Sequence, residues 1–282
     1  MSGQALLVLL LAPAAALHVG GGLRLRQQPS PHVRAGCISC GWGPEPVWSP
    51  HTVATICDAA SGLKALTVDA PAAAAGYAVP GQYVQIREPG AEKASFFAIA
   101  SAPGNAGAFE FLIKEQPPSE WSPGTGWLTG APAGTNVEMS QVMGGGFNLG
   151  KEGHGLDAVD SVLLFAAGSG IAPIRSAIES GQLARKDVTL YYGCATEAQM
   201  AYADKFSEWE KACGCKVVPV LSKPGAGWSG VTGYVQDVAA ASGVPSPGST
   251  LVLMCGMKGM AEGVKALASE VGIPEERVLA NF

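Results

Sequence analysis

The chain has 282 residues, of which 48% are hydrophobic and 15% are charged, and its formal net charge is −5. This composition excludes an intrinsically disordered chain, and the length suits one large domain or two of ordinary size. Because the net charge is negative, the composition gives no support to a nucleic-acid partner.

Residues 1–45 are predicted to be a targeting presequence. Residues 5–20 form an apolar run with an Ala-x-Ala type of cleavage site, and the run is shorter than the roughly 20 apolar residues of a membrane span. No Asp or Glu occurs from His18 to Pro44, although this stretch contains arginines. An apolar segment with a cleavage site, followed by an acid-free segment with arginines, resembles the bipartite presequence of algae with complex plastids. We therefore expect a plastid location. Secretion followed by a linker is the alternative, and no transmembrane span is expected in the mature chain.

An antiparallel six-stranded β-barrel is predicted for residues 46–151, where short strands are separated by Gly and Pro turns. No long helical pattern interrupts these strands, and closing them into a barrel would remove the free sheet edges. The predicted strands are residues 51–59, 63–70, 81–88, 95–101, 109–115 and 135–142.

A doubly wound parallel sheet is predicted for residues 157–282, after a linker at residues 152–157. Apolar runs that are typical of buried parallel strands alternate here with helical segments. The strands are expected at residues 161–168, 187–193, 216–222, 250–256 and 277–282, and the helices at 172–182, 198–212, 233–242 and 260–272.

The turn after the first of these strands has the composition of a phosphate-binding loop. Gly168, Ser169 and Gly170 stand where a strand ends and a helix begins. Glycines allow a close backbone approach, and a helix start offers free N–H groups to a phosphate. The third glycine of a Rossmann fingerprint is replaced by Pro173, which suits the first turn of a helix. An ordinary strand-to-helix turn is the alternative reading.

Residues 47–282 resemble the ferredoxin–NADP reductase family. The resemblance is carried by the Gly-x-Gly-x-x-Pro turn after a barrel, by Cys255, Gly256 and Met260 in "LMCGMKGM", and by the aromatic last residue, Phe282. It implies that FAD binds between the two domains and receives a hydride from NAD(P)H, because the cofactors carry the chemistry in this family.

The resemblance also implies roles for residues of the second domain. Gly168, Ser169, Gly170 and Pro173 would hold the NAD(P) pyrophosphate, Thr196 would lie at the adenosine ribose, and Gly256 and Met257 would lie near the nicotinamide. Cys255 and Phe282 are the expected catalytic residues. A small buried hydrophobe at a strand end is the alternative for Cys255.

The flavin strand departs from the family pattern Arg-x-Tyr-Ser. Alignment on Ile99 places Ser95, Phe97 and Ala98 at the three key positions. Phe97 would stack on the isoalloxazine, and Ala98 would keep only its backbone N–H. Ser95 lacks the guanidinium of the family's arginine. The charge-assisted bond of that guanidinium to the flavin pyrophosphate is worth on the order of 1.5–3 kcal/mol. Lys93 either substitutes for it or is simply solvated.

Further flavin contacts are expected from two other segments. Ile113 and Lys114 resemble the second flavin strand of the family. Gly124, Thr125 and Gly126 in "SPGTGWL" resemble the turn whose backbone cradles the pyrophosphate.

The leading hypothesis is an FAD-dependent NAD(P)H oxidoreductase that passes electrons to an unidentified acceptor. The runner-up is a flavin-free pseudo-reductase that acts as a binding or assembly subunit. A short-chain dehydrogenase fits poorly, because those enzymes have no barrel half. No metal site is expected, because His51 and His154 lack ligand spacing.

Overall fold

The computed structural model describes residues 44–105, 107–117 and 123–281. Residues 1–43, which make up nearly all of the predicted presequence, and the predicted catalytic residue Phe282 lie outside the described residues. The targeting assignment and the role of Phe282 therefore stay predictions, as do the proposed domain limits.

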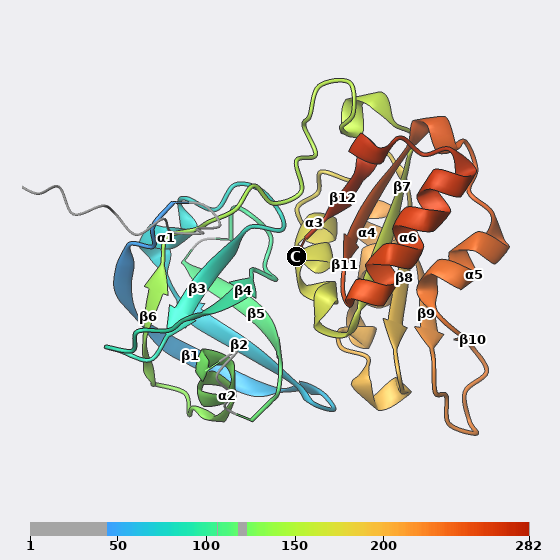
Figure 1. Cartoon of the computed structure of the whole chain (residues 1–282). Helices are drawn as coiled ribbons and strands as arrows, with labels where there is room; N and C mark the ends of the chain where they lie inside the picture. The colour runs from blue at the N-terminus through green and yellow to red at the C-terminus, as the bar shows by residue number, and fades with distance from the viewer. Residues whose placement is uncertain (1–43, 106, 118–122, 282) are drawn as a thin grey trace, which may run out of the picture. The chain divides into compact units, whose positions relative to one another are not determined.

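The first half of the described chain forms a six-stranded antiparallel sheet in the order β4-β3-β6-β1-β2-β5, as predicted (Figure 1). The N–H of Ala100, which follows β4, donates to the carbonyl of Glu110 in β5 across 2.7 Å and so links the two edge strands of the sheet. The strands are β1 (Trp48–Ala60), β2 (Leu63–Asp69), β3 (Tyr83–Arg87), β4 (Ser95–Ala98), β5 (Ala108–Lys114) and β6 (Asn136–Ser140).

The barrel core follows from the alternation of side chains along each strand. Phe109 and Phe111 of β5 point inward and are each 1% exposed. Their rings meet Tyr77 and Phe97 edge to face, with centroids 5.8 Å and 6.3 Å apart. Two short helices complete this half, α1 (Pro71–Ala74) and α2 (Pro123–Gly130). The segment that forms α2 was expected to be only a turn, so this helix is a correction.

The second half forms a six-stranded parallel sheet in the order β10-β9-β8-β7-β11-β12. The parallel sheet confirms the prediction, whereas the short edge strand β10 is an addition to the five predicted strands. The order reverses direction between β7 and β11, which makes the carboxyl end of these strands the switch point of the sheet. The strands are β7 (Ser161–Ala167), β8 (Asp187–Cys194), β9 (Lys216–Leu221), β10 (Val231–Thr232), β11 (Thr250–Cys255) and β12 (Val278–Ala280).

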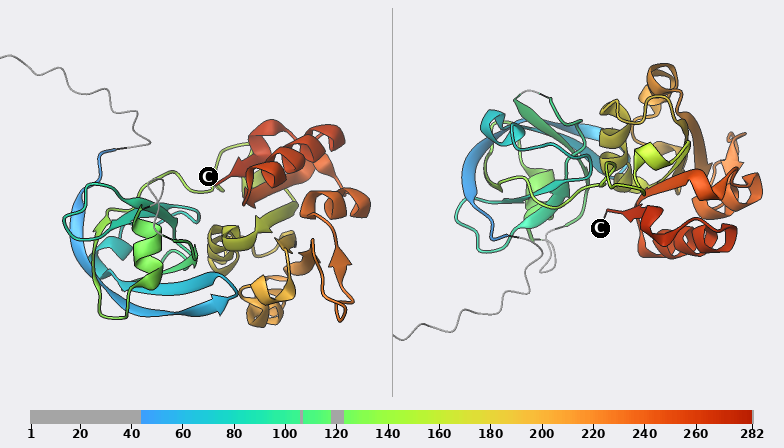
Figure 2. Two further views of the ribbon diagram at one scale, coloured as in Figure 1. Left: turned by 60° about the horizontal axis from the view of Figure 1, so that its bottom comes forward. Right: turned by 90° about the horizontal axis from the view of Figure 1, so that it is seen from above.

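Helices cover both faces of this parallel sheet (Figure 2). On one face, α3 (Ile171–Glu179) and α4 (Phe206–Cys213) bury side chains such as Ile174 and Trp209. On the other, α5 (Val235–Ser242) and α6 (Lys258–Val271) bury side chains such as Val235 and Val264. Because both faces are covered, the strands read as continuous apolar runs.

The helix expected over residues 198–212 is interrupted. The structure has short 3₁₀ turns at η3 (Glu197–Gln199) and η4 (Ala203–Lys205), and α4 begins only at Phe206. The capping box between Thr196 and Gln199 closes the first turn early. Tyr202 then adopts a left-handed conformation with φ of 60°, which ends the regular pattern.

Helix α3 carries direct contacts to the barrel half. The buried Arg175 side chain lies 2.6 Å from Glu110 of β5 and 2.9 Å from Glu179 of its own helix. Tyr77 donates its hydroxyl proton to the Ser101 carbonyl at 3.0 Å, and Ser176 hydrogen-bonds the same tyrosine oxygen. Buried apolar residues of both halves also belong to one cluster around α3.

In the part of the chain that the structure describes, none of the helices combines the length and the apolar character needed to cross a bilayer.

Arg175 is expected to be a stability determinant. The variant Arg175→Met would leave Glu110 without its cation and Glu179 with only Lys205, at 3.7 Å, and we expect it to lose about 3 kcal/mol of unfolding free energy. Lys258→Ala is the matched control, because its ion pair with Glu262 is exposed, and a loss of at most about 0.5 kcal/mol is expected. Urea denaturation measures both values, and equal midpoints for the two variants would contradict the assignment.

Candidate functional site

The predicted phosphate loop forms the 3₁₀ turn η2 (Gly168–Gly170) between β7 and α3. Gly168 has a φ of +54°, which favours glycine. A Cβ atom on Gly170 would lie only 2.2 Å from the Cys255 carbonyl oxygen. Gly170 therefore lets the ends of β7 and β11 meet backbone against backbone.

The loop after β11 is equally restricted. A Cβ atom on Gly256 would lie 3.0 Å from the Cβ of Ala167 and 2.9 Å from the terminal methyl group of Met260. The structure thus brings together Gly168, Ser169, Gly170, Cys255 and Gly256, all of which are predicted to meet one nucleotide. Two glycine-containing turns at neighbouring strand ends leave free N–H groups close to an exposed edge.

Three other assigned residues differ in how they meet this edge. Pro173 is buried within the first turn of α3, where its missing N–H requires no partner. Met257 is 70% exposed at the start of α6, so its side chain is open to a ligand. The Cys255 thiol is half-buried, and burial raises its pKa to about 12. Cys255 therefore stays a neutral thiol at physiological pH and does not act as a thiolate nucleophile.

Thr196 follows β8 at the same edge of the sheet, and its side chain joins the capping box with Gln199. Beside it, the Lys223 N–H donates to the Ala195 carbonyl at 2.8 Å. Lys223 is a cation at this edge that the sequence pattern does not predict, because it follows β9 rather than β8. The signal that points to it is its position immediately after a predicted parallel strand, since such strand ends share one edge.

The two faces of the flavin strand β4 have different surroundings. Its side chains alternate, so Ser95 and Phe97 point into the barrel and are 5% and 7% exposed. Phe97 packs against Phe111, and its ring lies on the face of β4 where Ser95 meets Gly124 of α2. The stacking of Phe97 on the isoalloxazine stays a prediction. The exposed ring of β4 is Phe96, at 59% exposure, which lies 5.6 Å from the Tyr83 ring.

The pleat of the strand places Ala94, Phe96 and Ala98 on the outer face and Ile99 inside, fully buried. Phe96 is therefore a second candidate for the ring that stacks on a flavin. Ala94 then takes the position two residues before the ring, and it also lacks a cation. The conclusion that this strand carries no arginine is unchanged.

The remaining flavin residues divide between the barrel interior and the surface. Ile113 is 4% exposed and belongs to the barrel core, so only its backbone is available to a ligand. Lys114, the last residue of β5, is exposed. Gly124 and Thr125 start α2 against β4, since a Cβ atom on Gly124 would lie 3.1 Å from the Ser95 hydroxyl. Gly126 follows in the same turn.

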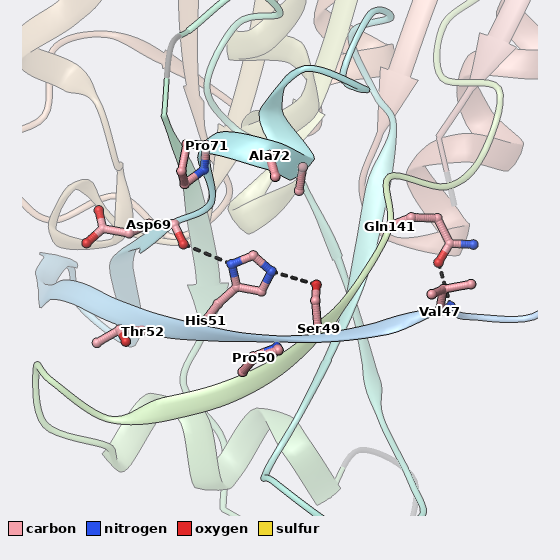
Figure 3. A pocket seen from close by; sticks show the side chains of 10 residues that line it. Val47, Ser49, Pro50, His51, Thr52, Asp69, Pro71, Ala72 and Gln141 are labelled. Carbon is pink, nitrogen blue, oxygen red and sulfur yellow. Dashed lines mark hydrogen bonds between the residues drawn. The ribbon is translucent and has the colours of Figure 1, made fainter.

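An open hollow of about 620 Å³ lies elsewhere on the barrel, between β1, the end of β2 and α1 (Figure 3). His51 bonds the Asp69 carbonyl at 2.9 Å through Nδ1 and the Ser49 hydroxyl at 2.8 Å through Nε2. None of the residues assigned to a cofactor lines this hollow. Within the described ranges, no group of three His, Cys, Asp or Glu side chains is placed to hold a metal ion.

Comparison with known proteins agrees with this geometry. Residues 164–266 match the model of the oxidoreductase NAD-binding domain. The fruit protein pKIWI502 of Actinidia deliciosa is 34% identical over 83% of this chain and 77% of that protein. Ferredoxin--NADP reductase B of Sorangium cellulosum is 28% identical over 70% of this chain and 82% of that protein.

The fold is shared with solved reductases. The structure of a ferredoxin NADP+ reductase from Neisseria gonorrhoeae with bound FAD and NADP superposes with a TM-score of 0.68, at 16% identity, over 84% of this chain and 100% of that one. The chain belongs to the ferredoxin–NADP reductase-like family of oxidoreductases. The two glycine turns at β7 and β11 are accordingly the candidate nucleotide site of a family member, and the outer face of β4 is its candidate flavin site.

We expect Gly170→Ala to weaken binding of the nicotinamide nucleotide by about tenfold or more, because the added methyl group must push the Cys255 carbonyl out of place. Gly248→Ala is the control, since its Cβ atom would meet nothing within 4 Å. Calorimetric titration with NAD⁺ and NADP⁺ measures the affinity, and circular dichroism confirms folding. A folded Gly170→Ala variant with unchanged affinity would show that the nucleotide binds elsewhere.

Proposed function

We propose that this chain oxidises NAD(P)H with the help of bound FAD and passes the electrons to an acceptor that is still to be identified. The observation that carries the proposal is the contact between Gly170 and the Cys255 carbonyl, because it builds a cradle that only glycine fits. Relatives named as ferredoxin–NADP reductase, and a structural neighbour with bound FAD and NADP, support it.

In this proposal the nucleotide phosphates meet the start of α3. The N–H groups of Ser169 and Gly170 lie in the turn that precedes the helix, where the helix dipole favours negative charge. Cys255 would lie beside the nicotinamide as a neutral thiol, because its pKa is raised by burial. Its contribution is therefore packing and orientation of the ring rather than proton transfer.

The barrel residues fit a flavin through stacking and backbone donors. Phe96 offers an exposed ring on the outer face of β4. Gly124, Thr125 and Gly126 form the start of α2 and would meet the pyrophosphate, because the start of a helix favours a negatively charged group. Bound FAD would supply the chemistry, by accepting a hydride and releasing electrons, and the protein would hold and orient it.

A specific observation also supports the alternative of a flavin-free subunit. The outer face of β4 has no arginine, and the nearby Arg87 is already committed, with its guanidinium 2.7 Å from Glu138 and 3.9 Å from the Trp48 ring centre. Without a charge-assisted bond to the pyrophosphate, affinity for FAD would fall by about one to two decades. A chain that lost the flavin in this way would keep its nucleotide cradle.

The deciding experiment is an absorbance spectrum of the protein purified with FAD, desalted, and then mixed with NADH or NADPH under anaerobic conditions. We expect the bands of oxidised flavin, and we expect one of the two nucleotides to bleach them. A folded protein that retains no flavin but still binds the nucleotide would support the flavin-free subunit instead.

The orientation of β4 predicts opposite outcomes for two neighbouring phenylalanines. Phe96→Ala removes an exposed ring, so the free energy of unfolding should change by no more than about 0.5 kcal/mol, while FAD affinity falls several-fold. Phe97→Ala removes a core ring and should cost about 3–5 kcal/mol of unfolding free energy. Denaturation curves and FAD titrations separate the two effects. A loss of FAD affinity without destabilisation in Phe97→Ala would assign the stacking ring to Phe97 instead.

A further inference from the structure

The hollow between β1, the end of β2 and α1 has no part in the proposed function. It forms because β1 continues beyond the end of β2: Thr52 pairs with Asp69, the last residue of β2, whereas residues 48–51 of β1 pair with β6. The chain then turns into α1, which supplies an apolar wall through Pro71, Ala72 and Ala73 (Figure 3). The volume of about 620 Å³ is sufficient for a small organic molecule.

A serine and a histidine line this hollow from one face of β1. Ser49 and His51 are two residues apart on the strand, so their side chains lie on the same face (Figure 3). The Ser49 hydroxyl oxygen lies 2.8 Å from Nε2 of His51, and Nδ1 of the same ring lies 2.9 Å from the Asp69 carbonyl oxygen. Both side chains are only partly buried, so a molecule in the hollow can reach the serine oxygen.

The Asp69 carbonyl determines which nitrogen of the neutral ring carries the proton. A carbonyl oxygen only accepts, so Nδ1 of His51 is the donor and Nε2 keeps its lone pair. The Ser49 hydroxyl then donates to Nε2 at 2.8 Å, which is closer than its other acceptor, the Met139 carbonyl at 3.4 Å. A hydroxyl, a histidine that accepts its proton and a third group that orients the histidine are the arrangement of an activated nucleophile.

We propose that Ser49, activated by His51, is a nucleophile that takes the acyl group of small carboxylic esters bound in the hollow. The Ser49 oxygen attacks the ester carbonyl carbon, and Nε2 of His51 takes the hydroxyl proton. The bond between this carbon and the alcohol oxygen then breaks, and the leaving alcohol takes the proton from Nε2. Water, deprotonated by the same nitrogen, hydrolyses the acyl-serine to the carboxylic acid and restores the serine.

The lining of the hollow determines which esters react. Among the described residues that line it there is no Lys or Arg to stabilise the negative oxygen of the tetrahedral intermediate. The Gln141 side chain is also engaged, because it accepts from the Val47 N–H at 2.7 Å and donates to the Glu45 carbonyl at 3.1 Å. We therefore expect reaction with esters that have a good leaving group, and slow hydrolysis that lets the acyl-serine accumulate.

The test mixes the full chain with p-nitrophenyl acetate, follows nitrophenolate by absorbance, and maps the acetylated peptides by mass spectrometry after an acid quench. We expect a burst of nitrophenolate equal in amount to the protein, and an acetyl group on Ser49. Ser49→Ala should abolish the burst, and His51→Gln should slow it by about 100-fold or more. Ser242→Ala is the matched control and should react as the wild type does, because this exposed serine donates to the Val238 carbonyl at 2.9 Å.

Three results would overturn the proposal. These are a wild-type chain that carries no acetyl group on Ser49, a Ser49→Ala variant that keeps the burst, and a His51→Gln variant that reacts as fast as the wild type. Circular dichroism confirms that each variant is folded, and the first result depends on no variant at all. The readout is an acetyl group on one serine, so it is independent of flavin binding and of any reductase activity.

Discussion

The contact between Gly170 and the Cys255 carbonyl is the constraint on which the nucleotide side of this molecule depends. Neighbouring parallel strands, β7 and β11, end at the same edge, and their following turns have space only for backbone. A side chain at Gly170 would overlap the opposite carbonyl, so the turn keeps its N–H groups free at the start of α3. The nucleotide site is therefore formed by the backbone of two glycine turns at neighbouring strand ends rather than by charged side chains.

The flavin side shows the same preference for backbone over charge. The outer face of β4 presents an aromatic ring but no cation, and the beginning of α2 lies against the strand through Gly124. The proposed flavin site consequently relies on stacking and helix-start donors. That reliance explains why both a weakly bound flavin and a flavin-free subunit are consistent with one barrel.

Helix α3 connects the nucleotide turn with the barrel half and with α4. It begins at the nucleotide turn, and its buried Arg175 reaches Glu110 of the barrel. Its last residue, Glu179, accepts a hydrogen bond from the Trp209 side chain at 3.1 Å, and the carbonyl of Trp209 contacts the Cys213 thiol.

The sequence by itself determined the two kinds of sheet, the glycine turn after β7 and the partner turn after β11, because strand periodicity and glycine placement are local signals. It also indicated that the flavin strand has no arginine. Only the tertiary structure decided which face of β4 meets the barrel interior, because one residue of register exchanges Phe96 for Phe97 and no local pattern reports it. Likewise, the position of Lys223 beside Ala195 and the break before α4 arise from strand neighbours and turn conformations that the sequence pattern does not contain.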